Sequence, residues 1–370
     1  MQSIARKMSP SEVFDVIIVG GGLSGLLIAR DAKKAGKRWK VLEAQEALGG
    51  RLQNDANGNK IDMGGAWIWP RHQPLMKKLV DSLGIDTFLQ PDDSSSTRIV
   101  GGAASIIQKI VDELQPADDD SYNKEEHVKI NCPVVSCTRK SGDMIEVQTA
   151  SGNLYCSKAV VIAAPPRITL HNIKFEPALS NAKGGAMSRS QTWMAGVTKV
   201  ALVYRSPRFW PPHESSRGFS PGPNRPAFQV YDGSPEDASI SVLTFFVLAS
   251  LVEGSDDESL ARLCCKQFCS SLAPSSLKNN SSFVECLEDF DTFHIKRWPY
   301  EKYISDDRYP QEIHPHPQPN QTLAMSEWDG LLLFAGSETD QQSPGVMEGA
   351  VGAAKRVSKD LLRIWNVGIK

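Results

Sequence analysis

Three glycines with a fixed spacing, Gly20, Gly22 and Gly25, are the residues of this sequence with the clearest chemical meaning. An apolar run at 16–19 precedes them, and residues 26–35 have helical spacing. In such a strand–turn–helix unit the first glycine allows a tight turn and the second lets the backbone approach a pyrophosphate. The third lets the helix pack closely on the strand. Because the N-terminus of a helix attracts anions, the pattern predicts a dinucleotide site.

An acidic residue stands where such a site needs one. A second strand-like run at 39–42 ends in Glu43, which lies 43 − 25 = 18 residues after Gly25. A carboxylate at about this distance binds a ribose hydroxyl in dinucleotide-binding folds. The strand–helix–strand order predicts an α/β fold with a Rossmann-like parallel sheet.

Composition excludes several other classes of protein. The chain has 370 residues, which allows two or three domains, and 41 basic against 43 acidic residues give a net charge of −2. No nucleic-acid partner is expected from this charge, and no apolar run is long enough for a membrane anchor. The first fifteen residues lack the apolar core of a secretion signal. Seven irregularly spaced cysteines indicate free thiols in a reducing compartment and no metal site. Together with the lack of a secretion signal and of a membrane span, they predict a soluble, intracellular protein of the cytoplasm.

The rest of the chain alternates between strand-like and helix-like segments. Helices are expected at 73–84, 104–114, 258–272 and 345–362, and strands at 144–149, 153–163, 196–205, 240–249 and 330–334. The segment 283–298 is expected to contain an extended run that leads into Arg297-Trp298-Pro299, and residues 91–98 are expected to form a polar linker. The last strand leads through a glycine and an acid into a helix, as the first one does. It therefore belongs with the N-terminal sheet, and the nucleotide domain is expected to be discontinuous.

Four motifs together resemble those of the flavin-dependent amine oxidase family, which includes monoamine and polyamine oxidases. They are Gly49-Gly50-Arg51, Asp62-Met63-Gly64-Gly65-Ala66-Trp67, Phe334-Ala335-Gly336-Ser337-Glu338 and Gly345-Val346-Met347-Glu348-Gly349-Ala350. The resemblance covers most of the chain and implies FAD as the cofactor, in place of NAD. It implies a Rossmann-like FAD-binding domain with a smaller mixed-sheet α+β substrate domain.

The resemblance also implies which residues bind the cofactor. The ADP portion and the pyrophosphate would be held by Gly20, Gly22, Ser24, Gly25, Glu43, Gly50, Arg51 and Val134. The flavin and the adjoining chain would be lined by Gly64, Gly65, Ala66, Trp67, Trp298, Tyr303, Gly336, Glu338, Val346 and Met347.

Lys199 is the candidate catalytic residue. It lies in a strand-like run that resembles the family strand carrying a lysine, which holds a water at flavin N5. A cation there can stabilise developing negative charge and favour reoxidation by oxygen. The alternative is a lysine at a strand end that points into solvent, and the residues alone leave both interpretations open.

Three departures from the family pattern concern the substrate side. The paired aromatic side chains that face the flavin would fall at Val346 and at Arg308, beside Tyr309, so the substrate pocket lacks an aromatic cage. Asp307 stands where some members have the cysteine that binds FAD covalently, which implies non-covalent FAD. The helical segment expected between residues 90 and 101 is missing, so another subunit or partner is a possible cover for the flavin.

These observations predict an FAD-binding domain of residues 1–90, 99–189 and 301–370 and a substrate domain of residues 190–300. The predicted function is hydride transfer from a C–H next to nitrogen, or from another activated carbon, of a small molecule to flavin N5. Molecular oxygen would then reoxidise the flavin. The alternatives are a desaturase, dehydrogenase or isomerase acting on a non-amine substrate, and a flavin-binding protein without turnover.

Overall fold

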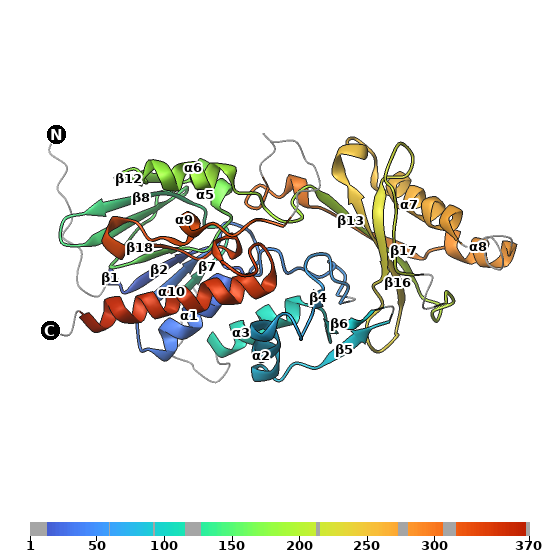
Figure 1. Cartoon of the computed structure of the whole chain (residues 1–370), viewed down its shortest axis with the longest axis horizontal. Coiled ribbons are helices and arrows are strands. Elements are labelled where there is room, and N and C mark those ends of the chain that lie inside the picture. The colour runs from blue at the N-terminus through green and yellow to red at the C-terminus, as the bar shows by residue number, and fades with distance from the viewer. Residues whose placement is uncertain are drawn as a thin grey trace. The chain divides into compact units, whose positions relative to one another are not determined.

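The computed structural model describes residues 13–58, 60–91, 93–114, 127–211, 215–272, 280–305 and 316–367 (Figure 1). The chain forms two compact units. The first contains residues 1–50, 107–192 and 316–370, and the second contains residues 51–106 and 193–315. These limits differ from the expected domains, because residues 51–90 and 99–106 fall in the second unit. The assignment of one domain to FAD and the other to substrate remains a prediction.

A parallel sheet forms the centre of the first unit. Its strands, in spatial order, are β18 (Leu332–Phe334), β11 (Val160–Ile162), β2 (Val16–Val19), β3 (Trp39–Leu42) and β7 (Val128–Lys129). The first four are buried along their whole length, and apart from Lys40 in β3 their sequences are apolar, as is typical of strands covered on both faces. The Rossmann-like α/β fold is therefore confirmed. The strand near the C-terminus lies in the same sheet as the N-terminal strand.

Two long helices cover one face of this sheet. They are α1 (Leu23–Lys34) and α10 (Met347–Val367), which lie side by side (Figure 1). A hydrogen bond of 2.7 Å from the Ser358 hydroxyl to Asp31 links them. The helix α3 (Ala104–Leu114) begins in the second unit and ends in the first. All three helices lie where helical spacing predicts them.

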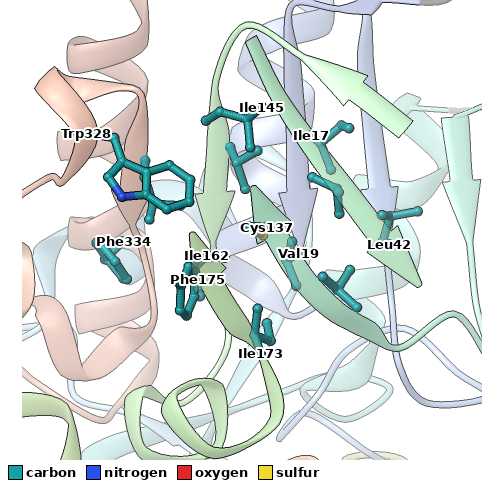
Figure 2. Packing of buried hydrophobic residues seen from close by; sticks show 14 of the residues in the cluster. Ile17, Val19, Leu42, Cys137, Ile145, Ile162, Ile173, Phe175, Trp328 and Phe334 are labelled. Carbon is teal, nitrogen blue, oxygen red and sulfur yellow. The ribbon is translucent and has the colours of Figure 1, made fainter. Parts of the chain in front are cut away.

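A second sheet shares the core of the first unit. Its strands, in spatial order, are β1 (Val13–Phe14), β10 (Leu154–Ser157), β9 (Met144–Thr149), β8 (Val134–Lys140) and β12 (Lys174–Glu176). The helices α5 (Pro166–Asn172), α6 (Asn181–Arg189) and α9 (Gln321–Ala324) complete this unit. Figure 2 shows Ile17 and Ile162 of the parallel sheet packed with Cys137, Ile145 and Phe175 of the second sheet. The glycine loop that follows β2 is thus built on a tightly packed base.

An antiparallel sheet forms the core of the second unit. Its strands, in spatial order, are β14 (Arg217–Gly218), β15 (Ala227–Asp232), β16 (Ser241–Leu248), β13 (Val197–Tyr204) and β17 (Thr292–Arg297). The helices α7 (Asp257–Ser271) and α8 (Ser281–Glu288) cover one face (Figure 1). On this face Val200 and Leu202 belong to the same buried core cluster as Leu260 and Phe268. Side chains alternate along a strand, so Lys199 and Ala201 lie on the opposite face.

One expectation from the sequence is wrong in this unit. The supposed linker at 91–98 belongs largely to β6 (Asp93–Ile99), the central strand of a sheet with β4 (Trp67–Ile68) and β5 (Thr87–Gln90). The helix α2 (Pro74–Ser82) lies between β4 and β5 in sequence. The polar sequence of β6 is misleading because Ser94 and Ser95 are exposed, whereas Arg98 is buried through hydrogen bonds and an ion pair. The extended run expected within 283–298 is confirmed as β17, and α8 precedes it.

Replacement of glycine by alanine should have opposite effects on stability at Gly25, where α1 packs closely on the loop after β2, and at Gly184, where there is open space. A Cβ at Gly25 would lie 2.1 Å from the Gly20 carbonyl oxygen, whereas a Cβ at Gly184 within α6 would meet no atom within 4 Å. We expect Gly25→Ala to lower the free energy of unfolding by about 2 kcal/mol. Gly184→Ala should raise it by about 0.5–1 kcal/mol, because alanine favours the helix. Urea unfolding followed by circular dichroism measures both, and an unchanged Gly25→Ala would contradict the packing argument.

Candidate functional site

Glycine is required at the three positions of the first loop for different structural reasons. Gly20 has a φ of +108°, and a Cβ there would lie 2.8 Å from the Ala163 carbonyl oxygen. Gly25 is required by the contact with Gly20 described above. Gly22, immediately before α1, is different, because the nearest atom to an added Cβ is the Gly49 oxygen at 3.9 Å. The fold itself leaves space at Gly22, as close approach of a pyrophosphate would require.

The glycine pair at 49–50 lies beside this loop. The Gly49 amide donates to the Gly21 oxygen at 2.9 Å, and Gly22 and Gly49 form a parallel bridge. Both Gly49 and Gly50 have positive φ values, of +115° and +59°. Two glycine-rich segments thus present backbone at one place, with no side chains between them.

Glu43 is held at the end of β3. Its carboxylate accepts from the Gly21 amide at 2.5 Å and from the Gln45 amide at 2.8 Å. Burial raises the pKa of this carboxyl, and the two amides oppose that rise. A carboxylate can accept more than two hydrogen bonds, so Glu43 can also accept from ribose hydroxyls. The Cys132 amide donates to the Glu43 backbone oxygen at 2.8 Å, which brings the Val134 segment next to it.

The C-terminal motif completes the group of site residues in the first unit. The Ser24 hydroxyl donates to the Ala335 oxygen at 2.6 Å, and a Cβ at Gly336 would lie 2.7 Å from the Ala164 oxygen. Glu338 is fully buried in the short helix η6 (Ser337–Thr339). Met347 is the first residue of α10, so its amide has no acceptor within the helix. Residues far apart in sequence therefore meet at the ends of β2 and β18, where open α/β sheets bind ligands.

The second unit brings together the other predicted cofactor residues. The Gly64 and Gly65 amides donate to the backbone oxygens of Gln53 and Arg51, both at 3.1 Å. A Cβ at Gly64 would lie 1.9 Å from the Arg51 oxygen, so this glycine has a packing reason. The Trp298 indole, in the short helix η4 (Trp298–Tyr300), donates to the Met63 oxygen at 3.0 Å. The segment that should line the flavin is fixed from two sides.

Lys199 lies under this segment and does not point into solvent. Only 1% of its surface is exposed, and its ammonium donates to the Gly64 oxygen at 2.9 Å. The Tyr231 and Phe246 rings each lie with centroids 5.3 Å from Nζ. Burial lowers the pKa of Lys199 to about 7, against an ordinary 10.5, although the Asp62 charge opposes this. A lysine in this state can hold or release a proton near neutral pH.

An ion pair next to Lys199 was not predicted from the sequence. Asp62 Oδ2 lies 3.2 Å from an Arg98 guanidinium nitrogen, and each residue is 1% exposed. The Ala103 amide donates to Asp62 Oδ1 at 2.7 Å. Arg98 also donates to the backbone oxygens of Gly233 and Ser234, at 3.1 and 2.7 Å. The burial of Arg98 could not be predicted, because this charged residue lies in the segment that was expected to be a polar linker.

Aromatic side chains gather on the same sheet face. Trp67 contacts Tyr231, with ring centroids 4.4 Å apart, and Phe246, at 5.8 Å. Its indole donates to Gln90 at 2.9 Å. Tyr231 and Phe246 were also missed, because β15 was not predicted and one aromatic residue in an apolar strand is indistinguishable from ordinary core.

Of the remaining predicted residues, some lie within the described ranges and others lie outside them. Tyr303 and Val346 are half-buried, and Ala66 is buried. Arg308, Tyr309 and Asp307 lie outside the described residues. Among the described residues, no group of three His, Cys, Asp or Glu side chains could hold a metal ion. No helix in the described ranges is long and apolar enough to cross a membrane.

Comparison with known proteins identifies the class to which this fold and site belong. The family model for flavin-containing amine oxidoreductases matches residues 92–362, and the model for NAD(P)-binding Rossmann-like domains matches residues 18–83. The chain belongs to the flavin-containing amine oxidoreductase family. Flavin is therefore the cofactor that the family implies, and the open backbone at Gly22 and the acceptor Glu43 fit its dinucleotide portion.

Individual relatives are distant. The flavin-containing amine oxidase of Oncorhynchus mykiss is 22% identical, with 96% of this chain and 87% of that protein covered. Putrescine oxidase bound to putrescine has a TM-score of 0.71 at 17% identity, and cyclohexylamine oxidase from Brevibacterium oxydans IH-35A has 0.73 at 16%. Each comparison covers 95% of this chain and 99% of the other. At this identity the structures show the amine oxidase fold alone.

The open space at Gly22 predicts a variant that folds but loses cofactor. We expect Gly22→Ala to keep its unfolding temperature, because the nearest atom to the new methyl group is 3.9 Å away. Its flavin affinity should fall about tenfold or more, since the methyl group occupies the space meant for the pyrophosphate. The ratio of flavin to protein absorbance, measured at several added FAD concentrations, tests this. Unchanged affinity would place the dinucleotide elsewhere.

The lowered pKa of Lys199 predicts a stability that rises with pH. Between pH 7 and pH 10.5 the unfolded chain binds a proton at this lysine that the folded chain has released. The free energy of unfolding should therefore rise by about 1.4 kcal/mol per pH unit in this window. Lys199→Met should remove that rise, whereas Lys77→Met, at an exposed position of α2, should keep it. Urea unfolding at a series of pH values tests this, and identical slopes in all three proteins would contradict it.

Proposed function

We propose that the protein is an FAD-dependent oxidoreductase of the amine oxidase type, acting on a small amine, with molecular oxygen as the electron acceptor. Bound FAD would supply the hydride acceptor for a C–H next to the substrate nitrogen. Membership of the family supports this chemistry. The observation that carries the proposal is the buried Lys199 bonded to Gly64, because this lysine lies against the segment predicted to line the flavin.

The chain's own residues have separate tasks in this proposal. The glycine loops and Glu43 bind the dinucleotide portion, and Met347 offers a helix N-terminal amide. Lys199 holds or releases a proton at Nζ and, when charged, stabilises negative charge in a site from which water is excluded. The rings of Trp67 and Tyr231 supply part of that water exclusion.

The flavin is proposed to be bound non-covalently. Asp307 stands where a covalent attachment would need a cysteine. The described cysteines lie in other places, such as Cys264 and Cys269 on α7 and Cys286 on α8. Precipitation of the protein with acid should therefore release the flavin into the supernatant.

Anaerobic mixing of the purified yellow protein with a panel of amines and amino acids tests the proposed chemistry. At least one primary or secondary amine should bleach the flavin absorbance. Readmitted oxygen should restore the absorbance with formation of one peroxide per flavin. If no amine bleaches the flavin, amine oxidation is the wrong chemistry. Bleaching followed by slow reoxidation in air would indicate a dehydrogenase.

The role of Lys199 is tested on the reoxidation step. Lys199→Met should slow the reaction of chemically reduced protein with oxygen by about 10²-fold, since a preorganised charge is lost. Lys77→Met, with its lysine on the exposed face of α2, serves as the control and should reoxidise at the native rate. Equal rates in both variants would remove Lys199 from the oxygen reaction.

A further inference from the structure

Two cations and one anion are buried together in the second unit. Arg98, Asp62 and Lys199 are each 1% exposed, and Arg98 and Lys199 both interact electrostatically with the Asp62 carboxylate. The three come from different elements: Arg98 from β6, Lys199 from β13, and Asp62 from the segment before β4. If all three were charged, the cluster would bury a net charge of +1.

Charge balance decides which group becomes neutral. A guanidinium does not lose its proton in proteins, and the Arg98 guanidinium is bound by Asp62 and by the backbone oxygens of Gly233 and Ser234. Asp62 also accepts the Ala103 amide, which further fixes its carboxylate. Lys199 is the group that can release a proton at low cost. Loss of this proton leaves the ion pair of Asp62 and Arg98, which has no net charge.

We infer that Arg98 is a positioning residue for Lys199 and acts through Asp62. Because Arg98 binds the Asp62 carboxylate, it weakens the attraction between this carboxylate and the Lys199 ammonium. The two partners then have opposite effects on the lysine. Asp62 favours its charged form and Arg98 favours its neutral form. This gives Arg98 a part in setting the charge beside the predicted flavin segment.

The other groups on the elements packed against Lys199 do not take over the electrostatic effect of Asp62 and Arg98 on this lysine. They are Tyr231 on β15, Phe246 on β16, Lys296 and His294 on β17, and Glu301 after η4. The two rings favour a charged lysine weakly. Lys296, directly opposite Lys199 on the neighbouring strand, pairs with Glu301, and His294 Nε2 lies 3.8 Å from Asp55.

The inference rests on the proposed function only for its catalytic meaning, and its test needs no substrate. NMR of the protein labelled with [¹⁵N]lysine follows the titration of the Lys199 ammonium, assigned by its loss in Lys199→Met. Asp62→Asn should lower the titration midpoint by about 1 pH unit, and Arg98→Met should raise it by about 1 unit. Arg98→Lys keeps the charge and should remain near the native midpoint.

Controls separate this effect from general damage to the fold. Arg262→Met breaks an exposed ion pair of the same unit, with Glu258 on α7 at 2.9 Å, and should leave the Lys199 midpoint unchanged. If Arg98→Met does not fold, Arg98→Gln removes the charge while keeping a donor for the carbonyl groups. Shifts of Asp62→Asn and Arg98→Met in the same direction, or no shift in either, would overturn the inference.

The outcome is independent of the amine panel. Opposite shifts in a protein that no amine reduces would uphold the electrostatic pair and reject amine oxidation. Amine oxidation without these shifts would uphold the proposed function and leave Arg98 with a purely structural role.

Discussion

Burial of charge on one face of the antiparallel sheet is the constraint on which the second unit depends. Transfer of ions out of water costs several kcal/mol for each ion, so burial of Asp62, Arg98 and Lys199 requires strong polar partners. Their partners include the backbone oxygens of Gly64, Gly233 and Ser234. The segment predicted to line the flavin is thereby fixed by directional contacts, which hold a backbone more narrowly than apolar packing does.

The corresponding constraint in the first unit is steric, because backbone segments approach one another closely at glycines. At Gly25, Gly336 and Gly349 an added Cβ would lie between 2.0 and 2.7 Å from a backbone oxygen. Helix, loop and strand therefore approach one another more closely than any side chain allows. Gly22 differs from these three, because the nearest atom to an added Cβ there is 3.9 Å away. Packing therefore explains Gly25, Gly336 and Gly349, whereas Gly22 agrees with the predicted approach of a pyrophosphate.

Sequence patterns predicted the first unit well because its signals are local. A buried parallel strand is a continuous apolar run, and the glycine loop and α1 follow it directly. The second unit was harder, because its site is made by pairing between distant strands. Arg98 has meaning only when β6 is recognised as a central strand beside the turn at 232–234, and a polar run such as Ser94–Ser95–Ser96 resembles a loop. Lys199 was identified by resemblance, but its burial was not apparent from its neighbours.

Stability alone does not explain why these charges are buried. Buried ion pairs can often be replaced by apolar side chains of similar volume with no loss of stability, or with a gain. A lysine whose pKa burial lowers to about 7 makes the folded state less stable at neutral pH than an apolar residue there would. The same sheet face already has apolar contacts between Ile61, Met63 and Val203 that could extend over this position. The needs of the fold alone therefore do not account for these charges, which agrees with the proposed role of Lys199 beside the Gly64 segment.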